Sequence, residues 1–303
     1  MRGTVILVCA VVSLFGSSRV VAQAQASGPF SLAVASFQRG LYHDALSYFR
    51  QAQKVNPQHG EAHHGVALCL YLTKRHRESL PHFVSAENCA NPQAQFFVNH
   101  AVCMEHLSRT AEAIVLLGRA ISVDPKFTNA WFNLGKFNLR QGKHEEALKS
   151  LTMTLQLEPK HKGAHYELGN LYFGRKDYPL AESWARKAVA LDSENPAPLY
   201  LLARSLLRLE RRAEGQSLAR KALNLRKEVD RKSRLQMKVN STLTLAFEEL
   251  RKKNIAAAIE YFKQVLRIDP RNPQAYSTLN GLADAFEKAG QPKTAASIRS
   301  LLK

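Results

Sequence analysis

The strongest constraint on this fold is a small side chain that recurs every 34 residues. Five consecutive steps of that length separate six positions, and a seventh position follows after 43 residues. A second small side chain lies 12 residues after each of them. A fixed period of this length indicates stacked copies of one supersecondary unit. The first small positions are Ala33, Ala67, Ala101, Gly135, Gly169, Ala203 and Ala246.

Each repeat reads as a pair of helices. Trp131, Leu134 and Asn138 are three or four residues apart, which is the spacing of one helix face. Gly142 interrupts the pattern, the same spacing resumes after it, and Pro159 closes the unit. A proline soon after a helix is expected because its ring cannot continue the hydrogen-bond ladder. One helix–turn–helix cannot bury its apolar face alone, so neighbouring units must stack.

The chain resembles the tetratricopeptide repeat family, whose motif reads W-x2-L-G-x2-Y, then A-x3-F, then A and P. The best local match consists of Trp131, Leu134, Gly135, Ala147, Leu151 and Pro159. The resemblance implies an all-α, right-handed superhelical solenoid of about seven repeats with a C-terminal capping helix pair. A composition with 45% apolar residues and only 4 Cys excludes a disulfide scaffold and a disordered chain.

The repeat spacing predicts three segments after residue 26. Residues 27–227 hold repeats one to six, 228–272 hold an extended helix and repeat seven, and 273–303 form the degenerate capping pair. The nine extra residues before Ala246 fall in the stretch KEVDRKSRLQMKVNST, which contains no Gly or Pro. We interpret them as an extension of one helix by about two and a half turns. A loop insertion is the alternative.

Residues 1–26 have the pattern of a secretory signal peptide. Arg2 precedes an apolar run, Thr4–Phe15, and Ala22, Ala24 and Ala26 then alternate. We expect cleavage after Ala24 or Ala26 and a periplasmic or secreted protein. An uncleaved membrane anchor is the alternative, although the run is shorter than the roughly 20 residues that cross a bilayer.

No motif for catalysis, a cofactor or a metal is evident. The sequence has no G-x-S-x-G, G-x-G-x-x-G, P-loop or C-x-x-C pattern. Seven histidines gather in and near repeats two and three, but paired ligands at i,i+4 on one helix are missing. We therefore predict a non-enzymatic protein without cofactor or metal. Cys69, Cys89 and Cys103 are interpreted as buried thiols, with a disulfide to Cys89 left open.

The resemblance implies a binding groove lined by the first helix of each repeat. Aromatic, amide and cationic side chains at those positions suit an extended peptide, because its backbone needs both donors and acceptors. Packing between repeats is the alternative for the aromatics. The predicted groove residues are Tyr71, Asn99, Phe132, Asn133, Lys136, Arg140, Tyr166, Asn170, Phe173, Tyr200, Arg204, Arg208, Phe247 and Arg251.

Positive charge is concentrated late in the chain. The formal net charge is +18, and residues 196–253 hold 15 Lys or Arg against 6 Asp or Glu. A dense basic surface attracts polyanions, so an alternative function is binding of anionic envelope components, with nucleic acid the least natural partner of an exported protein. A solvated helix face is the simpler explanation. The basic residues are Arg211, Arg212, Arg220, Lys221, Arg226, Lys227, Arg231, Lys232, Arg234 and Lys238.

Overall fold

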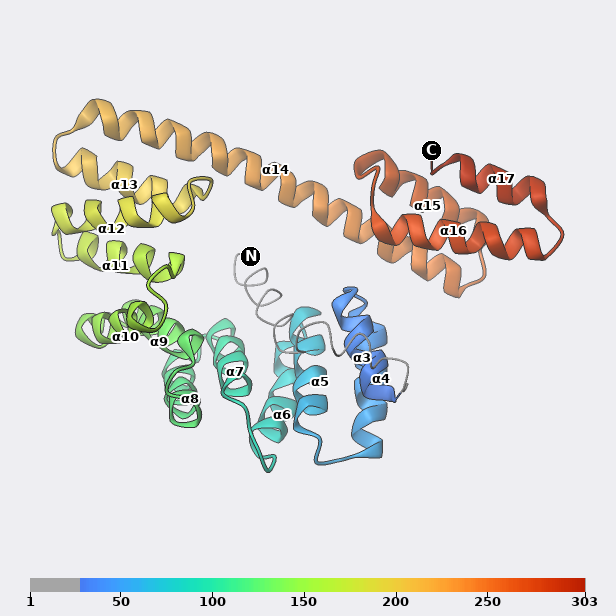
Figure 1. The fold of residues 1–303 in the computed structure, drawn as a ribbon, viewed down its shortest axis with the longest axis horizontal. Helices are drawn as coiled ribbons and strands as arrows, with labels where there is room; N and C mark the ends of the chain where they lie inside the picture. Colours follow the sequence, from blue (N-terminus) through green and yellow to red (C-terminus); the bar gives the residue numbers. More distant parts are fainter. Residues whose placement is uncertain (1–27, 303) are drawn as a thin grey trace. The chain divides into compact units, whose positions relative to one another are not determined.

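A computed structural model describes residues 28–302, which form α-helices joined by short turns without any strand in that range. The predicted signal peptide, 1–26, lies outside the described residues. Figure 1 labels the helices. Their bounds are α3 Pro29–Gln38, α4 Tyr42–Val55, α5 Gly60–Leu72, α6 His76–Glu87, α7 Ala94–His106, α8 Thr110–Val123, α9 Thr128–Arg140, α10 His144–Leu157, α11 Lys162–Gly174, α12 Tyr178–Leu191, α13 Pro196–Arg208, α14 Arg212–Arg251, α15 Ile255–Ile268, α16 Pro273–Lys288 and α17 Pro292–Ser300.

The described residues fall into two compact units. The first comprises residues up to Ser193 together with Leu201–Gln216. The second comprises Glu194–Tyr200 and the chain from Ser217 onward. Helices α13 and α14 therefore contribute residues to both units. The division predicted from the repeat spacing, with boundaries after residues 227 and 272, stays a prediction.

In the first unit, consecutive helices pair as the 34-residue pattern predicts (Figure 1). The small positions let the two helices of a pair approach closely. Ala33, Ala67 and Ala101 are fully buried. At Gly135 a Cβ atom would lie only 2.7 Å from Cγ of Leu151, which comes from the second helix of the same pair. A larger side chain at these positions would push the pair apart.

The turn inside each pair passes through a residue with positive φ. Gly142 has a φ of 74°, which glycine adopts without a steric penalty. Lys176 occupies the equivalent place one repeat later with a φ of 64°. The position recurs every 34 residues at Gly40, Lys74, Ser108, Gly142, Lys176 and Glu210, and the later turns have Lys253 and Gly290 there.

The turn between pairs is closed by a side chain of the following helix. Trp131 Nε1 donates to the backbone oxygen of Pro125 at 2.8 Å, six residues earlier. His63 and His165 repeat this bond, each from Nε2, to the oxygens of Pro57 and Pro159 at 2.9 Å. The first aromatic position of the motif thus satisfies a carbonyl that has no partner in the preceding helix.

Helix α14 departs from this pattern. It runs for 40 residues without interruption, from Arg212 to Arg251. The prediction of helix rather than loop for the nine extra residues is confirmed, but the result exceeds a simple extension. The second helix of repeat six and the first helix of repeat seven are one helix. No proline stands where the other repeats turn, so nothing breaks the hydrogen-bond ladder there.

The first helices of neighbouring pairs also contact one another in the first unit. Helix α3 contacts α5, α5 contacts α7, α7 contacts α9 and α9 contacts α11. The second helices do not approach each other as closely. The first helices therefore lie on the inner side of the curvature within this unit, and their outward-facing side chains share one surface.

Candidate functional site

Charged side chains from three successive first helices meet on this inner surface. Glu105 near the end of α7 forms an ion pair with Arg140 at the end of α9, and it also accepts a hydrogen bond of 2.7 Å from Thr110 Oγ1. Lys136 lies one turn before Arg140 on α9. On α11, Glu167 accepts a hydrogen bond of 3.2 Å from Asn170 Nδ2. The charges alternate from helix to helix.

Partial burial shifts the pKa values of two groups in this row. Burial lowers the pKa of Lys136, and Arg140 lowers it further, while Glu167 and Glu105 oppose the change. Burial raises the pKa of Glu167, against the opposing effects of Asn170, Lys136 and Arg140. Both shifts show that the charged forms have lost hydration. A partner group of opposite charge would therefore be held more strongly here than at a fully solvated position.

An aromatic–cation pair continues the row on α11 and α13. The guanidinium of Arg204 lies over the ring of Phe173, with its Cζ atom 4.2 Å from the ring centroid. The same ring contacts Tyr178 edge-on at 5.4 Å. Tyr166 is half-buried on α11, and Arg208 is exposed at the end of α13. The structure thus brings together Lys136, Arg140, Asn170, Phe173 and Arg204 of the predicted groove residues within the first unit.

Two predicted groove residues are buried, and the prediction that they line an open groove is wrong. Only 5% of Tyr71 is exposed, and its ring packs between those of His76 and His106, at centroid distances of 5.0 and 5.4 Å. Burial raises its pKa to about 12. Asn99 is 2% exposed, and its amide joins His64 and Gln95 through hydrogen bonds of 2.9 and 2.8 Å.

Two further aromatics of the predicted groove pack between helices. Packing between repeats was the alternative to groove lining for these aromatics. Phe132 contacts the ring of His161 at 4.5 Å, and a Cβ on Gly163 would lie 2.7 Å from the Phe132 ring. Phe247 contacts Phe262 edge-on at 5.5 Å in the core of the second unit.

The other three predicted groove residues are Asn133, Tyr200 and Arg251. Asn133 donates to the backbone oxygen of Asn129 on its own helix at 2.8 Å. Tyr200, half of whose surface is exposed, belongs to the second unit, as does the exposed Arg251 at the end of α14.

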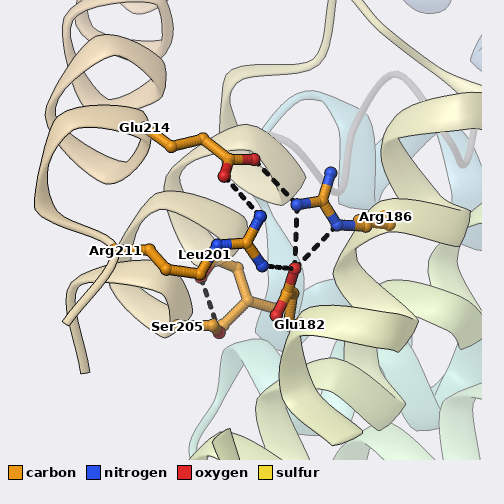
Figure 2. A network of polar contacts seen from close by, with 6 residues as sticks. All are labelled: Glu182, Arg186, Leu201, Ser205, Arg211 and Glu214. Atoms are coloured by element: carbon orange, nitrogen blue, oxygen red, sulfur yellow. Dashed lines mark hydrogen bonds and ion pairs between the residues drawn. The ribbon is translucent and has the colours of Figure 1, made fainter. Parts of the chain in front are cut away.

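The basic segment is not uniform. Arg211 is exposed and is engaged in a four-residue network, shown in Figure 2, and its place in the basic patch stays a prediction. It pairs with Glu182 at 2.7 Å and with Glu214, and Arg186 pairs with the same two carboxylates at 2.8 and 2.7 Å. Such a closed network neutralises its charges internally. Arg212 is exposed at the first position of α14. The other eight basic residues lie further along α14, in the second unit.

The histidines form ring pairs rather than metal sites. His63 and His82 stack at 6.2 Å, and His76 and His106 lie 5.6 Å apart. Within the part of the chain that the structure describes, no three His, Cys, Asp or Glu side chains are grouped for a metal. Cys69 and Cys103 are buried and Cys89 is half-buried, and all three are free thiols.

Comparison with known families supports the repeat assignment. A family model described as tetratricopeptide repeat matches residues 30–91, 139–196 and 243–298, and a second model of the same description matches 116–149. The chain belongs to the tetratricopeptide repeat family. Its helix pairs, small contact positions and closing prolines are those of this family, and the fold class predicted from the sequence is confirmed.

Relatives of this tetratricopeptide repeat protein are distant. It is 26% identical over 169 residues to superkiller protein 3 of Schizosaccharomyces pombe, which covers 55% of this chain and 12% of that protein. It is 25% identical over 240 residues to protein O-mannosyl-transferase TMTC3 of Homo sapiens. This match covers 78% of this chain and 25% of TMTC3. The chain therefore spans a quarter or less of these relatives.

A solved structure with the same fold is that of PilF from Pseudomonas aeruginosa. The TM-score is 0.57 at 20% sequence identity, and the match covers 63% of this chain and 86% of PilF. At this identity the likeness concerns the fold. Among residues 28–302, no helix combines the length and the apolar character needed to span a bilayer.

Sequence reasoning missed the two acidic members of the row in this tetratricopeptide repeat protein. Glu105 and Glu167 are not among the predicted groove residues, which are all cations, amides and aromatics. The signal that could have found Glu167 is its place in the motif, one repeat after Asn133. For Glu105, the 35-residue separation from Arg140, one repeat plus one, was the available hint.

Proposed function

We propose that the first unit of this tetratricopeptide repeat protein is a non-enzymatic scaffold that binds an extended segment of a partner protein. The family is one of protein-interaction scaffolds. The single observation that carries the finer proposal is the row of alternating charges on α7, α9, α11 and α13. Its members are Glu105, the pair Lys136 and Arg140, Glu167, and Arg204.

The chemistry of the row suits an extended peptide. Carboxylates accept from backbone N–H groups, and guanidinium, ammonium and amide groups donate to backbone carbonyls. Successive first helices lie roughly 8–10 Å apart, so one ligand crossing several repeats would meet both kinds of group in turn. The half-buried ring of Phe173 beside Arg204 adds an apolar surface.

We further propose that the protein is exported and acts in the cell envelope. The support is the pattern of residues 1–26, which lie outside the described structure. N-terminal sequencing of the chain isolated from its source should give a first residue of Gln25 or Ser27. An intact Met1 in the isolated protein would contradict export by cleavage.

The test of the groove compares two matched substitutions. Arg204→Gln removes a cation from an aromatic ring on the inner surface, and Lys187→Gln removes one from Trp184 on the second helix α12, where Lys187 Nζ lies 4.1 Å from the ring centroid. Both variants, and Tyr166→Ala, are used as bait in envelope extract at low and high salt.

We expect a defined protein to be retained by the wild type at high salt. Arg204→Gln and Tyr166→Ala should reduce its capture about tenfold, while Lys187→Gln leaves capture unchanged. Equal loss in the inner and outer variants would show that the inner surface is not the binding site. Retention of acidic material only at low salt would reject the groove in favour of general charge attraction.

A further inference from the structure

One face of helix α14 carries five cations in register. Arg220, Lys227, Arg231, Arg234 and Lys238 are separated by seven, four, three and four residues. At 3.6 residues per turn these steps bring all five within about 60° of the helix circumference. They extend over about 27 Å along the axis at 1.5 Å per residue. We call this set the basic stripe. All five belong to the second unit.

The basic stripe is exposed, and its cations form no ion pair within residues 28–302. Each of the five side chains is exposed. Within residues 28–302, none of the five forms an ion pair. The two acids of this stretch lie outside the stripe and pair with other cations. Glu228 pairs with Lys232 at 3.0 Å, and Asp230 pairs with Arg226 at 3.9 Å.

Exposed apolar side chains lie among or beside these cations. Leu223, between Arg220 and Lys227 in the sequence, is 52% exposed. Leu245, two turns beyond Lys238 on the same face, is 44% exposed. Cations interleaved with apolar side chains on a straight helix suit the boundary between lipid headgroups and acyl chains. Phosphates of a nucleic acid would gain nothing from the leucines.

We propose that the basic stripe of α14 is a docking surface for an anionic lipid bilayer. The argument is charge complementarity on one flat face. No groove borders the stripe, since residues 226–238 of α14 are exposed on all sides. A planar anionic surface can contact all five cations at once, whereas a bound peptide would need walls that this stretch lacks. This inference concerns the second unit and is independent of the peptide groove.

The test uses two triple variants with the same change in net charge. The stripe variant is Lys227→Gln, Arg231→Gln and Arg234→Gln. The control variant is Lys221→Gln, Arg226→Gln and Lys232→Gln, whose positions lie about 100° or more away from the stripe. The full chain is sedimented with phosphatidylcholine vesicles with and without phosphatidylglycerol, at low and high salt, and circular dichroism confirms that each variant folds.

We expect the wild type to bind only the vesicles that contain phosphatidylglycerol, and to be released by salt. Each cation near an anionic surface contributes about fivefold in affinity, so the stripe variant should bind on the order of 100-fold more weakly. The control variant should lose about fivefold or less.

Three outcomes would overturn the proposal. Equal loss in both variants would show attraction by net charge alone. Absence of binding to anionic vesicles would reject a bilayer partner. Tighter binding to polyglutamate or duplex DNA than to the vesicles would assign the stripe to an acidic protein or a nucleic acid. Arg204→Gln should leave vesicle binding unchanged, so failure of the groove and failure of the stripe are distinguishable.

Discussion

Two junctions between repeats show how one sequence pattern gives opposite results. Between α10 and α11 the chain turns, with Pro159 after the helix and the side chain of His165 closing the turn. In the middle of α14 the corresponding junction has no proline and nine additional residues, and the helix continues. The proline and the closing hydrogen bond are both present where the chain turns, and both are missing where the helix continues.

The same two regions also differ in how their cations form ion pairs. Where the chain turns, a cation can pair with an acid of the neighbouring repeat, as Lys162 at the start of α11 does with Asp192 at 3.7 Å. Residues 226–238 along the middle of α14 are all exposed, and the ion pairs found there join residues of the same helix. Such pairs require a spacing of three or four residues. Arg226 pairs with Asp230 in this way, and Lys232 pairs with Glu228. The five cations of the basic stripe form no such ion pair within residues 28–302.

The largest effect is expected from forcing a break into α14. Val229→Pro removes a backbone donor and places the proline ring against the carbonyl four residues earlier, which destabilises a helix interior by about 3 kcal/mol. Circular dichroism and urea unfolding should both report the loss. Lys160→Pro, in the turn between α10 and α11, is the control and should change stability by less than about 0.5 kcal/mol. Similar losses in both variants would mean that α14 is not a continuous helix.

A second prediction concerns pH, to which the buried polar residues of the first unit should respond. Burial of His64 lowers its pKa to about 3. The unfolded chain, with a pKa near 6.5, binds the proton more readily, so stability is full above pH ~6.5 and falls as the pH decreases toward 3. The free energy of unfolding then decreases by up to about 1.4 kcal/mol for each unit of pH.

His64→Gln should flatten that slope in urea unfolding measured from pH 7 to pH 4 (roughly the window below the unfolded pKa). The Gln oxygen can still accept the hydrogen bond from Asn99. His43→Gln, which changes an exposed histidine on α4, is the matched control. An unchanged slope in His64→Gln would show that protonation of this imidazole does not govern acid stability.

The smallest effect concerns the closing hydrogen bond itself. Trp131→Phe keeps an aromatic ring but removes the bond to the Pro125 oxygen, which should lower the free energy of unfolding by about 1 kcal/mol. Trp184→Phe changes a half-buried tryptophan on α12 and serves as the comparison. If the two substitutions have the same effect on the urea midpoint, the bond does not stabilise the turn.

The repeat positions could be predicted because their physics is local. Ala33 and Gly135 are small because two helices of one pair must touch, and that requirement recurs every 34 residues. The groove was predicted less well. Tyr71 and Asn99 occupy groove positions of the motif but are buried, since their polar atoms and rings find partners on adjacent side chains. Position in a motif does not specify which neighbours cover a residue.

The helix pairs, the turns at Gly142 and Pro159, and the helical character of the nine extra residues could be predicted from the sequence, because backbone preferences act within a few residues. Only the tertiary structure decided which charges remain available. Glu105 meets Arg140 across 35 residues and Arg211 meets Glu182 across 29, while Arg231 and Arg234 form no ion pair within residues 28–302. Ion pairing depends on distances of a few ångströms between helices, and those distances are set by how the repeats pack.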